Sequence, residues 1–419
     1  MRKKRLNILM TVAAVAAMPV AGGMTPDALV AEALERNPEL KFYTAEINAA
    51  KGTVRTARII RNPELNAQAG YKNVQDNADG GNGDGAAWSI SLTQTFEYPG
   101  RIALRKAIAS RDVDLAQLHL QQFRRTLAAR TRALAYSTGI TSARSATARE
   151  IASRFQSLSE VLQQRPAAGI TPQLEARIIH ANGLSFRRQE REAALAEATI
   201  RAELNQLRGR PANSSLAVTA GSVTFGATSL PNLIKAGHSN AFEIRIRQTE
   251  LAQQGLKVAL SKHERYPAVA VGPYYTQENA ADKEQQVGLG LSLPLPFWDR
   301  NIGSIETSSA REQQAKAGLL TAEAEVESRI TQNFATLQAK RTEIDTLQAN
   351  ELTTARETAE LADRNYKLGA VPLTIYVETQ KQYLDLVTTI CDLQKEALQA
   401  AQELEILTGA RLYRAQPLP

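Results

Sequence analysis

Residues Tyr366–Gln382, YKLGAVPLTIYVETQKQ, decide the fold. A long Ala-rich helical pattern runs up to Gly369, and a second long pattern starts at Pro372. Glycine suits the left-handed position just past a helix end, and proline suits the first turn of the next helix. The stretch therefore predicts two long helices joined by a very tight turn.

The same turn occurs 200 positions earlier, where Gly169 and Pro172 take the places of the later glycine and proline. The match continues downstream, since Leu207–Gly209 precedes the similar Leu407–Gly409 by the same offset. A repeat of this length indicates one structural unit built twice.

The chain starts with MRKKRLNILMTVAAVAAMPVAGG, which has a basic beginning, an apolar run and small residues at its end. This pattern is typical of a secretory signal peptide. A transmembrane anchor is the alternative, but the apolar run Ile8–Val20 is short for one. We therefore predict a signal peptide at 1–22, a first structural repeat at 23–220 and a second at 221–419.

The composition favours long helices over a wide globular core, because aromatic residues make up only 5% of the chain and Ala, Gln, Arg, Glu and Leu dominate. The net charge of +7 is partly in the leader, and no basic stripe is interleaved with aromatics, so no nucleic-acid partner is predicted. The single cysteine, Cys391, cannot form an intramolecular disulfide and fits a small packing residue.

Each half also contains two segments with period-two patterning. In the first half they lie at about 64–74 and 87–98, with apolar residues on one face and polar residues on the other. A loop rich in Gly, Asp and Asn joins them, which predicts a β-hairpin. The second half repeats the hairpin at about 267–275 and 286–295.

Each predicted strand has about ten residues, the length that a tilted strand needs to cross a bilayer. Aromatic residues gather near the strand ends, as in the interfacial girdles of transmembrane barrels. The edge of a soluble sandwich is the alternative for this pattern. The candidate girdle residues are Tyr71, Trp88, Phe96, Tyr98, Tyr275, Phe297 and Trp298.

A proline-free helical stretch follows each hairpin, at 102–165 and 302–368. At 1.5 Å per residue, roughly 60 residues reach about 90 Å, so the two tight turns are expected far from the hairpins. In the second stretch apolar residues recur at spacings of three, four or seven, with one spacing of five from Leu347 to Leu352. This pattern indicates a coiled-coil-like seam.

Four membrane strands cannot close a barrel, and lipid does not tolerate open sheet edges. We therefore predict a mainly α, internally duplicated fold whose four strands per chain complete a 12-stranded transmembrane β-barrel in a trimer. The long helices of three chains would continue it as a hollow α-helical barrel. Such an assembly is a conduit and not a catalyst, so no enzyme activity is predicted.

Several motifs resemble those of the outer-membrane efflux protein family of TolC type: Glu32–Leu40 (EALERNPEL), Asn62–Leu65 (NPEL), the Gly369–Gln380 turn and the Leu407–Gly409 end. The resemblance covers essentially the mature chain and rests on the order and duplication of the motifs. Within this family the short length and the paired NPEL segments are most similar to CzcC-type subunits of heavy-metal efflux systems.

This resemblance implies a homotrimeric outer-membrane channel with a multi-pass β-barrel surrounded by lipid and a long periplasmic helical extension. It also implies two partners, a periplasmic adaptor (membrane fusion protein) and an inner-membrane, proton-driven RND-type pump. The implied cargo is a divalent heavy-metal cation of the cobalt, nickel, zinc or cadmium class. A same-fold duct for drug efflux or type I protein secretion stays open as an alternative, as does a periplasmic adaptor with a helical hairpin.

No P-loop, GxGxxG or HExxH motif occurs, and the four histidines fit no ligand spacing, so no cofactor or resident metal is predicted. The tight turns are instead predicted to form a periplasmic tip that contacts the adaptor. The candidate tip residues are Gly169, Pro172, Gly369 and Pro372.

The residues just before the second turn are candidates for a periplasmic gate. They are Asp363, Arg364 and Tyr366, whereas the first half has Gln163, Gln164 and Pro166 at the equivalent places. Related channels carry acidic rings and polar links between helices in this region, so the resemblance implies a ring role for Asp363 and a link role for Arg364. The alternative is that both are solvated charges on a helix surface.

Overall fold

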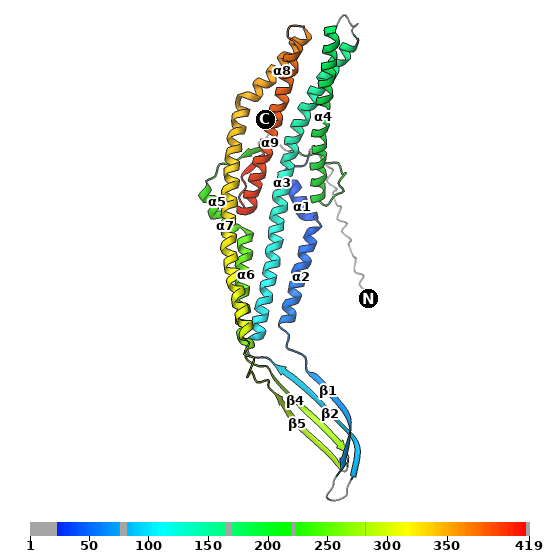
Figure 1. The fold of residues 1–419 in the computed structure, drawn as a ribbon, viewed down its shortest axis with the longest axis vertical. Coiled ribbons are helices and arrows are strands. Elements are labelled where there is room, and N and C mark those ends of the chain that lie inside the picture. Colours follow the sequence, from blue (N-terminus) through cyan, green and yellow to red (C-terminus); the bar gives the residue numbers. More distant parts are fainter. Residues whose placement is uncertain are drawn as a thin grey trace, which may run out of the picture.

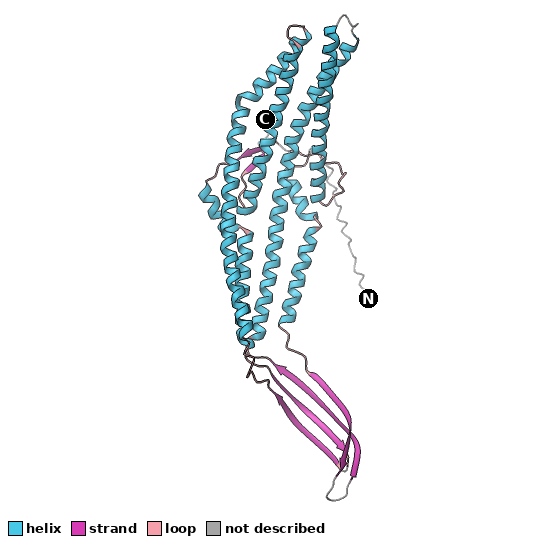
Figure 2. Ribbon diagram, in the orientation of Figure 1, coloured by secondary structure: helices cyan, strands magenta, loops and turns pink. Residues whose placement is uncertain are grey.

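The computed structural model describes residues 23–75, 82–164, 170–219, 221, 223–280 and 282–415. The predicted signal peptide and the turn residue Gly169 lie outside these ranges. The protein is a long rod whose helices run from a sheet at one end to two hairpin tips at the other (Figure 1). Figure 2 shows the strands gathered at the sheet end, apart from a short pair beside the middle of the rod.

Both halves of the chain have the same order of elements: two short helices lead into two strands, and long helices follow. The first half contains α1 (Pro26–Arg36), α2 (Glu39–Ala57), β1 (Glu64–Gln75), β2 (Asn82–Phe96), α3 (Arg101–Gln164) and α4 (Ile170–Leu207). The second half contains α5 (Leu230–Asn240), α6 (Phe242–Glu264), β4 (Val269–Asn279), β5 (Lys283–Ser292), α7 (Ile302–Thr346), α8 (Leu352–Lys367) and α9 (Leu373–Thr408). The short strands β3 (Val223–Phe225) and β6 (Tyr413–Ala415) pair with each other.

In each half an asparagine at the end of the first short helix forms a hydrogen bond to the end of the last long helix. The Asn37 side chain donates a hydrogen bond to the carbonyl of Leu207, at the end of α4, and accepts one from the backbone N–H of Glu39. Asn240 donates in the same way to the carbonyl of Thr408, at the end of α9. The bonds satisfy carbonyls that a helix end leaves without an intrahelical partner. In both halves the break between the two short helices is therefore tied to the end of the last long helix.

The four long strands form one antiparallel sheet in the order β1-β2-β4-β5, so β1 and β5 are its edges. Strands β2 and β4 come from opposite halves of the chain and pair directly, with Trp88 opposite Gln277. The strand ends differ slightly from the prediction. Strand β2 begins at Asn82, and β5 ends at Ser292 because Pro294 soon follows and cannot donate a ladder hydrogen bond.

The register of the strands gives the sheet one apolar and one polar face. On the apolar face Leu65 of β1 lies opposite Leu92 of β2, and Leu289 of β5 is 78% exposed in the single chain. On the polar face Lys72 of β1 forms an ion pair with Glu278 of β4, reaching across β2. The period-two patterning is therefore realised, and the apolar face is uncovered in the protomer.

The second long helix is interrupted, so the prediction of one continuous helix at 302–368 was wrong. After α7 the chain forms a π-helical turn, η1 (Leu347–Glu351), and the helix changes direction as it continues into α8 (Figure 1). A π-helical turn takes up one residue more than an α-helical turn. The seam contains its one spacing of five at this place, from Leu347 to Leu352. The counterpart α3 is a single helix of 64 residues, so the two halves differ here.

The core runs along the rod and centres on α9, which packs against α3 on one side and against α7 and α8 on the other. Ala397 and Ala401 of α9 are fully buried, and their small side chains let the neighbouring helices approach closely. Near mid-length a buried ion pair joins the halves: Arg132 of α3 donates to Glu405 of α9. In the part of the chain that the structure describes, no helix is long and apolar enough to cross a membrane.

Candidate functional site

The turn between α8 and α9 has the geometry that the sequence predicts. Gly369 has φ +74°, and the N–H of Ala370 donates to the carbonyl of Asn365, which closes the end of α8. Pro372 is the N-cap of α9, in an extended conformation. In the first half Pro172 lies in the first turn of α4. Nothing lies within 4 Å of a Cβ added at Gly369, so this glycine is required by the backbone conformation and not by crowding.

The two charged gate candidates are adjacent on α8 but differ in burial. Asp363 is only 9% exposed and accepts a hydrogen bond from Lys367, 2.7 Å away. Its carboxylate also lies beside the hydroxyl of the fully buried Tyr376 of α9, and burial together with this carboxylate raises the pKa of Tyr376. Arg364 is exposed. In the protomer Arg364 is therefore a solvated charge on the helix surface, as the alternative expects, whereas Asp363 is not.

A column of stacked aromatic rings joins the two helical hairpins near their tips. Phe155 of α3 packs on Phe186 of α4 at 4.8 Å between ring centroids, and on Tyr376 of α9 at 5.1 Å. Tyr376 stacks in turn on Tyr366 of α8 at 4.9 Å. The third gate candidate, Tyr366, is thus the end of a column to which all four tip helices contribute. The pair Phe155–Phe186 is tilted and the other two are stacked, and such aromatic pairs are each worth about 0.5–1.5 kcal/mol beyond the area that they bury.

A polar link runs beside the aromatic column. Gln380 of α9 is fully buried and donates to the carbonyl of Ala359 in α8, at 2.6 Å. Its side-chain oxygen accepts from Arg154 of α3, at 3.2 Å, and Arg154 also pairs with Glu150. Arg154 therefore makes a polar link between the two hairpins beside the aromatic column, and the link role of Arg364 stays a prediction. Sequence reasoning missed it, because an arginine on a long polar helix carries no signal about which helix it faces.

A cavity of about 690 Å³ opens between the two tips. Its walls come from α3 and from the α8–α9 turn, and they include Leu158, Tyr366, Lys367, Gly369 and Leu373. The cavity therefore lies between the end of α3 and the α8–α9 turn, while the column and the polar link join the two hairpins below it.

The predicted girdle aromatics lie in two groups along the sheet. Trp88 and Tyr275 pack together at 5.1 Å between ring centroids, and Tyr71 shares their face nearer the hairpin loops. From Phe96 to Trp88 the strand is about 26 Å long, which a tilt of about 40° reduces to a height of about 20 Å, somewhat less than a lipid-facing band of about 25 Å. Their contact with lipid stays a prediction. The exposed group at the helix end of the sheet consists of Phe96, Tyr98, Phe297 and Trp298.

Among the residues that the structure describes, no group of three or more His, Cys, Asp or Glu side chains could hold a metal ion. The four histidines are dispersed over α3, α4, α5 and α6. His238 lies 3.7 Å from Glu327, and His263 lies against the ring of Tyr98.

The family model described as "Outer membrane efflux protein" matches residues 29–210 and 233–410. The chain belongs to the outer membrane efflux protein family. The two matched segments each begin in the first short helix of a half and end just beyond its last long helix.

Individual proteins are similar to this chain over most of its length, in sequence or in fold. The chain is 23% identical over 398 residues to the cobalt-zinc-cadmium resistance protein CzcC of Cupriavidus metallidurans, covering 93% of this chain and 91% of that one. Its fold is similar to that of CusC, with a TM-score of 0.72, 15% identity and coverage of 94% and 96%. The Campylobacter jejuni outer membrane channel CmeC matches with a TM-score of 0.71, 13% identity and coverage of 99% and 94%. The predicted fold class and the predicted resemblance are confirmed.

Proposed function

We propose that three copies of this chain form an outer-membrane channel, the exit duct of a tripartite efflux system. The observation that carries the proposal is the four-stranded sheet with one uncovered apolar face and two unpaired edges. Lipid offers no hydrogen-bond partners, so these edges must pair with other copies. Joining β1 of one protomer to β5 of the next closes an antiparallel barrel of twelve strands after three copies.

The polar face of the sheet would line the interior of this barrel, where water accepts side chains that are costly in lipid. Lys72 and Glu278 pair on that face, and Tyr274 accepts a hydrogen bond from Gln286 on it. The helices would continue the interior as a hollow cylinder on the periplasmic side. The length of α3 alone, 64 residues, corresponds to about 96 Å.

The hairpin tips are the proposed contact with a periplasmic adaptor, through which the duct would meet a proton-driven RND-type pump of the inner membrane. The cavity between the tips supports this assignment, because it exposes apolar side chains at the far end of the rod. The alternative that this chain is itself a periplasmic adaptor is set aside. The chain belongs to the outer membrane efflux protein family and carries both β-hairpins. The proposed tip residues remain Gly169, Pro172, Gly369 and Pro372.

We keep the gate at the end of the second hairpin, at Asp363, Arg364 and Tyr366. Arg364 is free to face the axis of a trimer, because it is exposed in the protomer. Asp363 is held against α9, so a ring of three Asp363 carboxylates would need α8 to turn relative to α9. The interruption at η1 supplies a place where α8 can change its direction.

Divalent heavy-metal cations are the proposed cargo. The support is the similarity to a protein named for resistance to cobalt, zinc and cadmium, over nearly the whole of both chains. The alternative cargoes are drugs or a secreted protein, which would use a duct of the same fold.

Two substitutions at the same depth and on opposite faces of β5 test the membrane assembly. Leu289→Lys puts a charge on the apolar face, which costs about 2–4 kcal/mol at the middle of a bilayer. Gly290→Lys puts the same charge on the polar face, where an added Cβ has no contact closer than 3.7 Å. We expect the first variant to lose the heat-sensitive trimer in outer-membrane extracts, and the second to keep it. Equal trimer yields for both variants would contradict the proposed orientation of the sheet.

The cargo is tested by deleting the gene and comparing the minimal inhibitory concentrations of cobalt, nickel, zinc and cadmium salts with those of a panel of drugs. We expect resistance to one or more of the cations to fall severalfold, and drug resistance to stay unchanged. The wild-type gene and the Gly290→Lys variant should restore resistance, while Leu289→Lys should not. A fall confined to the drugs would reassign the cargo without affecting the channel proposal.

A further inference from the structure

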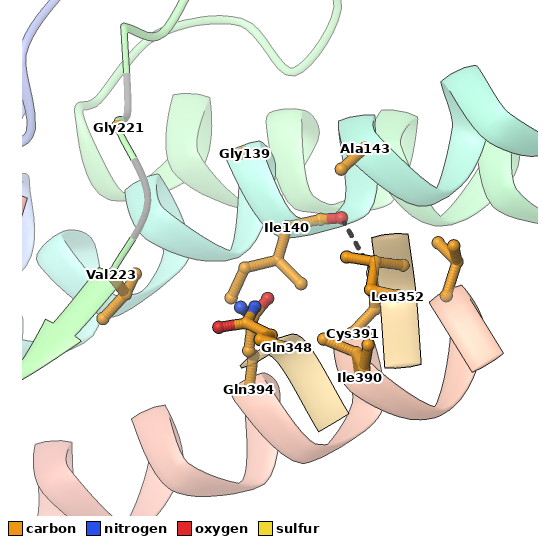
Figure 3. Close-up of a pocket in the computed structure, with 11 residues that line it drawn as sticks. Gly139, Ile140, Ala143, Gly221, Val223, Gln348, Leu352, Ile390, Cys391 and Gln394 are labelled. Carbon is orange, nitrogen blue, oxygen red and sulfur yellow. Dashed lines mark hydrogen bonds between the residues drawn. The ribbon is translucent and has the colours of Figure 1, made fainter. Parts of the chain in front are cut away.

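A second cavity lies beside the π-helical turn, away from the tips and the sheet. It has a volume of about 270 Å³ and opens between α3, α9, strand β3 and the start of α8 (Figure 3). Most of its wall is apolar, and two glutamine side chains are its main polar groups. The apolar part consists of Ile140, Val223, Leu352, Val387, Ile390 and Cys391.

The wall of this cavity includes part of the π-helical turn η1, where the second long helix changes direction. Gln348 belongs to η1, and Leu352 is the first residue of α8. The opposite wall is formed by α3 and α9, which are continuous helices at this level. A molecule in the cavity would therefore touch both the interrupted helix and the two continuous helices beside it.

We propose that this cavity binds a small, mainly apolar molecule of one or two fused rings that carries a single hydrogen-bonding group, and that the bound molecule holds the π-helical turn in place. Binding does not depend on the proposed cargo or on transport. An apolar cavity of about 150 Å³ is large enough to bind benzene, so one of 270 Å³ has room for a second ring. The amides of Gln348 and Gln394 offer both a donor and an acceptor to the polar group.

Cys391 provides a reporter at the wall of the cavity. It is 4% exposed, and its thiol donates to the carbonyl of Ile140 at 3.5 Å (Figure 3). Burial raises the pKa of this thiol, so little of it is thiolate at neutral pH. Because it is the single cysteine of the chain, a thiol reagent reports on this site alone.

The first measurement is the rate at which N-ethylmaleimide alkylates Cys391 in the purified full-length protein in detergent, at about pH 8.5. The probe is 2-naphthol, which has two fused rings and one hydroxyl group. At ten times its dissociation constant, mass action leaves about one site in eleven free, so alkylation should slow about tenfold. An alkylation rate that does not change up to the solubility limit of 2-naphthol would overturn the proposal.

A cavity-filling variant supplies the matched control. Ala143→Leu adds three carbons at the cavity wall, whereas Ala146→Leu adds them one turn further along α3, outside the cavity. Both variants should stay folded, because both alanines are exposed positions of a long helix. Protection by 2-naphthol should be lost only in Ala143→Leu. Equal protection in both variants would place the binding elsewhere and overturn the assignment to this cavity.

The second measurement tests whether the bound molecule holds the π-helical turn in place. Saturating 2-naphthol should slow amide hydrogen exchange severalfold in the peptide that contains residues 347–351, and should leave exchange in the middle of α3 unchanged. Protection of Cys391 without slower exchange at the π-helical turn would overturn the second part of the proposal. Neither measurement requires an intact efflux system, so failure here and failure of the channel function are distinguishable.

Discussion

Replacing Arg132 with methionine should lower the free energy of unfolding by about 3–5 kcal/mol, since it leaves the buried Glu405 carboxylate without its partner. Arg132 is 4% exposed and Glu405 7% exposed. Glu405 approaches no other cation within ion-pair distance in the part of the chain that the structure describes. The loss should appear as a lower midpoint of thermal unfolding, followed by circular dichroism at 222 nm in detergent.

The same helix offers a matched control two residues away. Arg130 also pairs with a glutamate, Glu203 at 2.5 Å, but its side chain is 55% exposed. An exposed ion pair contributes about 0–1 kcal/mol, so Arg130→Met should unfold almost like the wild type. In the double variant Arg132→Met/Glu405→Leu most of the lost stability should return, because apolar side chains replace both buried charges. If the Arg130 and Arg132 variants lost equal stability, the buried pair would have no special importance.

Tyr376→Ala should separate the two hairpins near their tips and increase the time that the channel spends open. The ring is fully buried between Phe155 and Tyr366, and removing a large buried aromatic side chain costs about 3–5 kcal/mol. Since this ring joins α9 to both α3 and α8, its loss removes the main contact between the hairpins at this level. Conductance of single trimers in planar bilayers measures the effect.

Tyr376→Phe is the control that separates packing from polarity. It keeps both stacked contacts and removes only the hydroxyl beside Asp363, so its conductance should stay close to that of the wild type. Gln380→Leu should have an intermediate effect, because it breaks the polar link to Arg154 but leaves the rings in place. Wild-type conductance in Tyr376→Ala would show that the aromatic column does not hold the channel closed. If Arg364→Ala opened the channel and neither Tyr376→Ala nor Gln380→Leu did, the polar link that keeps the channel closed would be assigned to Arg364.

The sequence predicts much of the fold, because the decisive signals are local. Gly369 and Pro372 fix a tight turn through backbone conformation, and alternating residues fix the faces of the strands, whatever the rest of the chain does. The π-helical turn also left a local signal, the spacing of five from Leu347 to Leu352. A single irregular spacing among many regular ones is a weak signal, because an α-helical seam can contain one irregularity without forming a π-helical turn.

The contacts between the hairpins could not be predicted in the same way. Whether Arg154 reaches Gln380, or Asp363 turns toward Tyr376, depends on the rotation of each helix about its axis and on the distance between helices. A coiled-coil-like pattern defines an apolar stripe about 100° wide and leaves the residues at its margins undecided. Asp363 lies at such a margin and is buried, while the next residue, Arg364, points outward.

The pairing of β2 with β4 has a consequence for the order of folding. Trp88 and Gln277 are neighbours in the sheet although nearly half of the chain separates them. Closing so long a loop is entropically costly while it is flexible, but the α3–α4 hairpin leads the chain up the rod and back. With α5 and α6 also formed, the second β-hairpin arrives beside the first. Helix formation should therefore precede the pairing of β2 with β4, so the two β-hairpins become a single four-stranded sheet only after the helices between them have formed.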